Sequence, residues 1–179
     1  MTGPTSENPL FDHDTHPRFE EVLPNHAKAA IPLLLEKAKD DFSAFESTIE
    51  PTWNGIFERQ RKLIEPLGYA WHITGHLMSV RNSDELRAVY EELQPSVVEF
   101  FTALGQSTAT YKALETLVAS EEWKVIGPTK RRLVEKELLR MQGRALQSFI
   151  EMEDENKRIV RMVGNLEANP ALKDRYFNN

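Results

Sequence analysis

The chain has 179 residues, of which 40% are hydrophobic and 28% charged, a composition typical of one soluble globular domain and inconsistent with wholesale disorder. Its net charge of −6 argues against binding to nucleic acid or to an anionic membrane, because polyanions repel an acidic surface. The absence of cysteine excludes disulfides, thiolate nucleophiles and cysteine-based zinc sites. No apolar run is long enough to span a membrane and residues 1–17 lack the pattern of a signal peptide, so we expect a cytoplasmic protein.

The chain divides into an N-terminal segment over residues 1–24 and a helical domain over residues 25–179. The first segment contains prolines at positions 4, 9, 17 and 24, with acidic and polar residues between them. Because proline fixes φ and donates no backbone hydrogen bond, we predict that this segment is extended and lies along a surface.

The first helix is predicted to run from Asn25 to the pair Glu50-Pro51, because a residue before proline is disfavoured in the α region. Pro32 removes a hydrogen bond to residue 28, so we expect the helix to start late or to bend. Its apolar residues recur at intervals of three or four and comprise Ala27, Ala30, Ile31, Leu34, Leu35, Ala38, Phe42 and Phe45.

A second helix is predicted from Thr52, a suitable N-cap, to the pair Arg81-Asn82. Its apolar phase continues through Pro66 and Gly68, so we expect a kink there rather than an end. The stripe comprises Trp53, Ile56, Phe57, Leu63, Ile64, Leu67, Ala70, Trp71, Leu77 and Met78.

A third helical region follows Ser83, which can cap a helix whose first turn carries acidic residues at the positive end of the dipole. Its pattern passes through Pro95 and Gly105 and leaves two possibilities open, one kinked helix or two abutting helices. Residues 118–129 are interpreted as a connection anchored by Trp123.

A last helix of about ten turns is predicted from about Lys130 to the pair Asn169-Pro170. No segment alternates apolar and polar residues in the manner of a strand. The sequence therefore predicts an all-α fold, a bundle of long antiparallel helices with short connections, preceded by an extended proline-rich N-terminal segment.

Candidate chemistry in the sequence is limited to one histidine pair. The glycines form no phosphate-binding loop, and there is no G-x-S-x-G elbow. His72 and His76 share a helix face at the spacing used in the zinc motif H-E-x-x-H, but position 73 is isoleucine, so the general-base glutamate is missing. We interpret them as ordinary histidines, one hydrogen-bonded near the core and one exposed. We assign no catalytic, cofactor-binding or metal-binding residue.

Several segments resemble the N-terminal region of the thimet oligopeptidase family, in its oligopeptidase A branch. The resemblance covers about residues 8–140, and its most specific part is His76–Glu91. The other segments are Asn8-Pro9-Leu10, Phe19–Val22, Pro24-Asn25-His26 with Ala29-Ala30-Ile31, Thr52-Trp53 and Leu133–Leu138.

This resemblance implies a family of zinc metallopeptidases that cut short peptides in a channel between two mostly helical halves. The family's H-E-x-x-H motif lies in the carboxy-terminal half, and nothing in this sequence corresponds to it. We therefore expect this chain to be inactive by itself and to hold no cofactor, with zinc belonging to the full-length family. After about Arg140 the family has a Gly-rich break, whereas this sequence continues in helical phase.

Three functional hypotheses follow. The chain is the non-catalytic N-terminal domain of an oligopeptidase A-like enzyme and helps wall the peptide channel, with a peptidase catalytic half as its partner. Alternatively, it is a stand-alone helical module that uses the same scaffold to bind or regulate another protein. The third hypothesis is a metal-binding bundle that uses His72 and His76.

The last helix also predicts self-association. Its apolar stripe extends beyond the part that resembles the family, where the other helices are not expected to cover it. We therefore expect a homodimer through the carboxy-terminal half of this helix, and neither nucleic acid nor membrane as a partner. The stripe comprises Ala145, Phe149, Met152, Ile159, Val163 and Leu166.

Overall fold

The computed structural model describes residues 8–14 and 16–168, and over these residues it is all-α. The chain forms two compact units, which divide between Val134 and Glu135. Among the described helices, none combines the length and the apolar composition needed to cross a membrane. The element order confirms the all-α part of the predicted fold class over the described residues.

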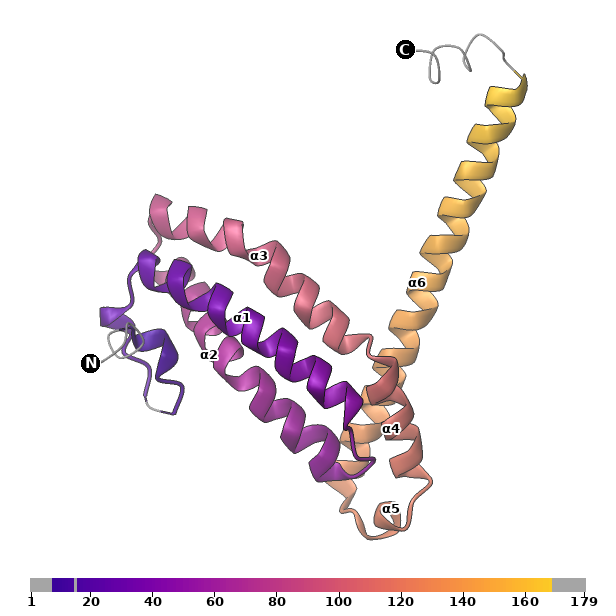
Figure 1. Ribbon diagram of the computed structural model, residues 1–179, viewed down its shortest axis with the longest axis horizontal. Coiled ribbons are helices and arrows are strands. Elements are labelled where there is room, and N and C mark those ends of the chain that lie inside the picture. Colours follow the sequence, from indigo (N-terminus) through magenta and orange to yellow (C-terminus); the bar gives the residue numbers. More distant parts are fainter. Residues whose placement is uncertain (1–7, 15, 169–179) are drawn as a thin grey trace. The chain divides into compact units, whose positions relative to one another are not determined.

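The first unit is built on three long helices, α1 (Pro24–Ser47), α2 (Arg59–Val80) and α3 (Asp84–Gly105), which lie side by side (Figure 1). Consecutive helices run antiparallel, so α1 and α3 run in the same direction. Contacts at both ends of this pair show the common direction: Lys28 Nζ lies 3.2 Å from Glu92 Oε2, and Ser107 Oγ donates to Glu46 Oε1 at 2.5 Å.

A single hydrophobic core joins these helices, and it is formed largely by the predicted stripes. All eight apolar residues predicted for the first helix are buried. Leu10 and Val22 from the N-terminal segment join the same core. From α2 and α3 the buried members are Leu67, Ala70, Ile73, Leu77, Leu86, Val89, Val97 and Phe100.

The start of α1 differs from the prediction. The helix begins at Pro24 and continues through Pro32, so the late start expected from Pro32 is wrong. Pro24 occupies the first helical position, where a missing N–H costs nothing and the fixed φ suits the helix. One interior proline leaves a single carbonyl without its helical donor, which the surrounding tertiary packing tolerates.

A short π-helical turn, η3 (Asn54–Glu58), precedes α2. Thr52 acts as the predicted cap, since its Oγ1 accepts a hydrogen bond from Gly55 N at 2.9 Å. Gly55 is packed closely here, because a Cβ at this position would lie 2.5 Å from the carbonyl oxygen of Glu50. α2 ends at Val80 with Arg81 as its C-cap, as predicted.

The region after Ser83 consists of two helices. Ser83 Oγ accepts from Leu86 N at 3.1 Å and caps α3, as predicted. α3 ends at Gly105, and α4 (Thr108–Val118) begins after Ser107, whose Oγ accepts from Thr110 N at 3.0 Å. The alternative of two abutting helices is therefore the one that the structure shows.

The connection after α4 contains a short helix, α5 (Glu121–Val125), which was not predicted. Its Trp123 is half-buried, whereas Ile126, the residue after α5, is buried. α6 (Pro128–Ala168) begins two residues before the predicted Lys130 and continues unbroken to Ala168. The predicted stop at Asn169-Pro170 lies outside the described residues.

Candidate functional site

The two histidines singled out by the sequence lie one turn apart on α2, and both are exposed. The ring of His76 lies against the ring of Phe19, with centroids 5.2 Å apart. The expectation that one histidine lies near the core is therefore wrong, because the buried residues of this turn are Ile73, Thr74 and Leu77.

A metal site would need more than this pair. Zinc in proteins takes at least three protein ligands, and catalytic sites add a water. Within the described part of the chain, no group of three histidine, aspartate or glutamate side chains is placed to hold a metal ion. The residues around His72 and His76 therefore do not fit a zinc centre.

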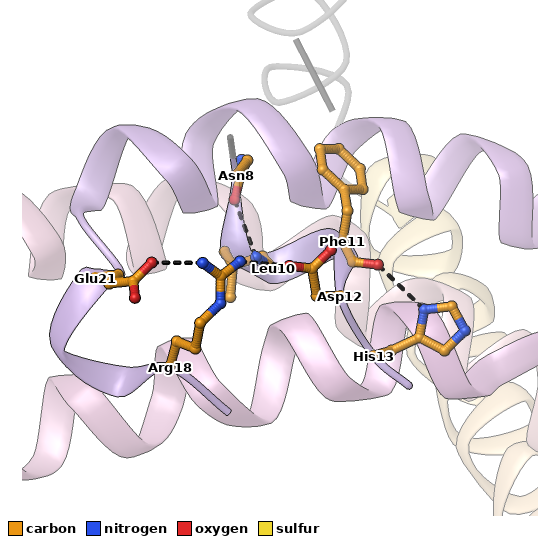
Figure 2. A network of polar contacts seen from close by, with 7 residues as sticks. All are labelled: Asn8, Leu10, Phe11, Asp12, His13, Arg18 and Glu21. Atoms are coloured by element: carbon orange, nitrogen blue, oxygen red, sulfur yellow. Dashed lines mark hydrogen bonds and ion pairs between the residues drawn. The ribbon is translucent and has the colours of Figure 1, made fainter. Parts of the chain in front are cut away.

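Polar contacts fold the N-terminal segment into a clip, residues 8–14 and 16–21, that is held against α1 and α2 (Figure 2). The side chain of Asn8 is buried. Its Oδ1 accepts from Leu10 N at 3.1 Å, and its Nδ2 donates to the carbonyl of His26 at 2.9 Å. Leu10, on the turn η1 (Pro9–Phe11), is fully buried. One amide side chain therefore orders the turn and fastens it to the first turn of α1.

Arg18 joins the two ends of the clip. Its guanidinium pairs with Asp12 after η1 and, at 2.6 Å, with Glu21 of the second turn, η2 (Phe19–Glu21) (Figure 2). All three side chains are substantially exposed, so water screens these pairs and each stabilises the clip by no more than about 1 kcal/mol.

The clip also changes the environment of one phenol. Burial raises the pKa of Tyr69, on α2, and the Asp12 carboxylate raises it further, whereas Arg18 lowers it. The phenol consequently stays protonated at neutral pH and can donate hydrogen bonds, but it offers no general base. The clip is a structural attachment rather than a reaction centre.

A second feature is an open hollow of about 410 Å³ at the corner between η3, α5 and the start of α6. Its lining includes Trp53, Glu122, Ile126 and Lys130. Glu122 Oε1 accepts from Trp53 N at 3.1 Å, and Lys130 Nζ lies 4.5 Å from the centre of the Trp53 ring. Both charged groups are thus engaged by the same tryptophan.

The basic residues at the start of α6 have structural contacts. Besides the contact of Lys130 with Trp53, the guanidinium of Arg131 lies over the ring of Trp123 and donates to the carbonyl of Lys124 at 2.8 Å. These cation–π contacts fasten α6 to the preceding corner. The clip and the corner each join separate elements of the first unit.

Known proteins share this domain. Residues 31–157 match the family described as the N-terminal domain of neurolysin and thimet oligopeptidase. A probable cytosolic oligopeptidase A of Arabidopsis thaliana is 33% identical over 152 residues, which are 85% of this chain and 21% of that protein. An organellar oligopeptidase A of the same plant is 33% identical over 133 residues, 74% of this chain and 17% of that protein.

A bacterial relative is also similar to this chain. The oligopeptidase A of Escherichia coli K12 is 28% identical over 132 residues, 73% of this chain and 19% of the bacterial protein. The chain therefore spans about a fifth of the length of the curated relatives that it matches. The family match continues past residue 140 and extends well into α6.

Proposed function

Because the chain belongs to the neurolysin and thimet oligopeptidase family and carries its N-terminal domain, we propose that it is the non-catalytic N-terminal domain of an oligopeptidase A-like metallopeptidase. In this role it forms part of the wall of the peptide channel, and the catalytic half is its partner. The family match over residues 31–157 is the observation that carries this proposal.

The architecture of the first unit supports a scaffolding role. Its core joins α1, α2 and α3, and the clip adds a buried anchor at Leu10. A surface held in this way changes little in shape, which is what a channel wall requires, since substrate positioning depends on fixed geometry. A cytoplasmic location is part of the proposal, supported by the relative that is named cytosolic.

The proposed role assigns no zinc chemistry to this chain. The resemblance places the family's zinc motif in the carboxy-terminal half, and these 179 residues contain no H-E-x-x-H. The exposed pair His72 and His76 supplies two of the three protein ligands that such a centre needs. Any zinc-dependent cleavage would therefore depend on residues outside this sequence.

The purified chain is expected to hydrolyse no peptide, with or without added zinc. A set of quenched fluorescent peptides would measure this, and the rates should equal those of buffer. His72→Ala should leave the result unchanged. Cleavage that co-purifies with the chain, is sensitive to a chelator and disappears in His72→Ala would contradict the prediction.

A graft tests the proposed role directly. The segment of the Arabidopsis cytosolic relative that matches this chain would be deleted and then replaced by this chain. We expect the deletion to abolish peptide cleavage and the graft to restore it at least tenfold above the deleted enzyme. A graft with His72→Ala and His76→Ala should be equally active. A folded graft no more active than the deleted enzyme would overturn the proposal.

A further inference from the structure

One asparagine of the chain is followed directly by glycine, the pair from which a side-chain amide is most easily lost. Asn54-Gly55 is the single such pair among the 179 residues. Asparagine is a thermolabile residue, because the backbone nitrogen of the next residue can attack its side-chain carbonyl. Glycine has no Cβ to crowd this attack. The pair therefore forms a candidate modification site at the start of the turn η3.

The reaction at this pair needs only water as a co-reactant. The nitrogen of Gly55 attacks Cγ of Asn54, so that an N–Cγ bond forms, the Cγ–Nδ2 bond breaks, and Nδ2 leaves as ammonia with the proton from Gly55. Water then opens the cyclic imide. Opening at Cγ gives aspartate, whereas opening at the main-chain carbonyl gives isoaspartate, in which the backbone runs through the former side chain.

The structure leaves the side chain of Asn54 accessible but holds the peptide group that must react. Asn54 is exposed and lines the hollow at the corner of the first unit. The peptide N–H after it donates to Thr52 Oγ1 at 2.9 Å, and the carbonyl of the same peptide group accepts from Arg59 N. The imide closes only when this peptide plane rotates about ψ of Asn54, and that rotation breaks both hydrogen bonds.

We propose that Asn54 is a site of spontaneous deamidation and that local opening of η3 sets its rate. Short turns open with a much lower free energy than that of global unfolding. During each opening, the backbone nitrogen of Gly55 is free to attack the side chain of Asn54. The closed turn therefore slows the reaction without abolishing it.

The isoaspartate product does not fit the closed turn. It adds one carbon atom to the backbone between positions 54 and 55. Gly55 has no space for an added atom, since even a Cβ there would lie 2.5 Å from the carbonyl oxygen of Glu50. η3 cannot close again in its original form, so a transient opening becomes a permanent change at the start of α2.

This change would reach the neighbouring corner through Trp53, which directly precedes the modified residue. The backbone N–H of Trp53 donates to Glu122 Oε1 at 3.1 Å, and the centre of its ring lies 4.5 Å from Lys130 Nζ. A displaced η3 weakens both contacts. Isoaspartate at position 54 is therefore expected to loosen the attachment of α5 and of the start of α6 within the first unit.

Peptide mapping of the full chain would measure the reaction after incubation at 37 °C and pH 7.4, in buffer or in 6 M guanidinium chloride. Conversion of Asn54 is expected to be at least about tenfold slower in buffer, because only the open turn reacts. Asn82-Ser83 is the matched control, since it lies in the link between α2 and α3, and its two rates should differ much less. Equal rates for Asn54 in the two conditions would overturn the proposal, as would no conversion in guanidinium chloride.

Thr52→Val removes the hydroxyl that accepts from Gly55 N but keeps the branched shape of the side chain. In buffer this variant should convert Asn54 several-fold faster than the natural chain does, and in guanidinium chloride at the same rate. Thr116→Val removes a hydroxyl that donates to the carbonyl of Lys112 in α4, and it should leave both rates unchanged. If the two variants converted Asn54 equally fast in buffer, the hydrogen bond of η3 would not control the reaction.

The stability of the modified chain tests the permanent change. The product carries one more negative charge, so anion exchange separates it from the unmodified chain, and peptide mapping identifies the isoaspartate fraction. Its urea midpoint, followed by tryptophan fluorescence, should be lower than that of Asn54→Asp, which carries the same charge on an unaltered backbone. Equal midpoints for these two proteins would refute the expected loosening of the turn.

Discussion

Ile31→Ala is expected to lower the free energy of unfolding of the first unit by about 2–5 kcal/mol, the usual range for truncating a large buried aliphatic side chain. Ile31 is fully buried in α1 and belongs to the core that joins α1, α2 and α3. The substitution removes apolar burial and leaves a cavity, and a close-packed interior relaxes only partly around it. Urea denaturation should show a lower midpoint.

The neighbouring residue Leu33 provides the matched control. It lies on the same helix but is 56% exposed, so Leu33→Ala should change the stability by no more than about 0.5 kcal/mol. The tryptophans Trp53, Trp71 and Trp123 all precede the division at Val134, so their fluorescence reports the unfolding of the first unit. Equal midpoints for the two variants would show that Ile31 does not lie in the core.

This pair also shows how far the sequence could predict the fold. Ile31 belongs to the periodic stripe and Leu33 does not, although the two side chains are equally apolar. Periodicity separates them because a helix buries one face only. The caps Thr52 and Ser83 were predictable for a related reason, since a hydroxyl before a helix can accept from the free N–H groups of its first turn.

Other features depend on tertiary contacts that a local pattern does not contain. The break after Gly105 is fixed by Ser107, which caps α4 and also donates to Glu46 of α1, 61 residues earlier. The helix α1 could begin at Pro24 or near Pro32, and the apolar periodicity alone does not distinguish these two starting points. A helix as short as α5 contains too few residues to show a period.

The candidate site was less predictable than the fold. The pair His72 and His76 has the spacing of a metal motif, but spacing within one helix cannot provide a third ligand from elsewhere in the fold. The buried Asn8, which holds the clip, gave no signal beyond its place in the segment that resembles the family. Its role arises from the carbonyl of His26, 18 residues away, and only the folded chain brings the two together.

Gly55→Ala is expected to destabilise the first unit by about 1–3 kcal/mol, although glycine is normally the poorer helix former. A Cβ at this position would lie 2.5 Å from the carbonyl oxygen of Glu50, 2.7 Å from Glu50 Cβ and 2.8 Å from Thr52 Oγ1. Two of these three atoms are backbone or Cβ and cannot rotate away. The turn η3 must therefore shift, which would weaken the hydrogen bond from Gly55 N to Thr52 that starts the helix.

The same substitution at Gly68, inside α2, is expected to have the opposite effect on stability. There the nearest atom to a new Cβ is His72 Nδ1 at 3.9 Å, an ordinary van der Waals contact. Gly68→Ala should therefore gain up to about 1 kcal/mol from the helix preference of alanine. Urea midpoints, followed by tryptophan fluorescence, should fall for Gly55→Ala and stay level or rise for Gly68→Ala. If Gly55→Ala were as stable as the natural chain, the prediction would be wrong, because a Cβ at position 55 would then fit beside Glu50 without a shift of the backbone.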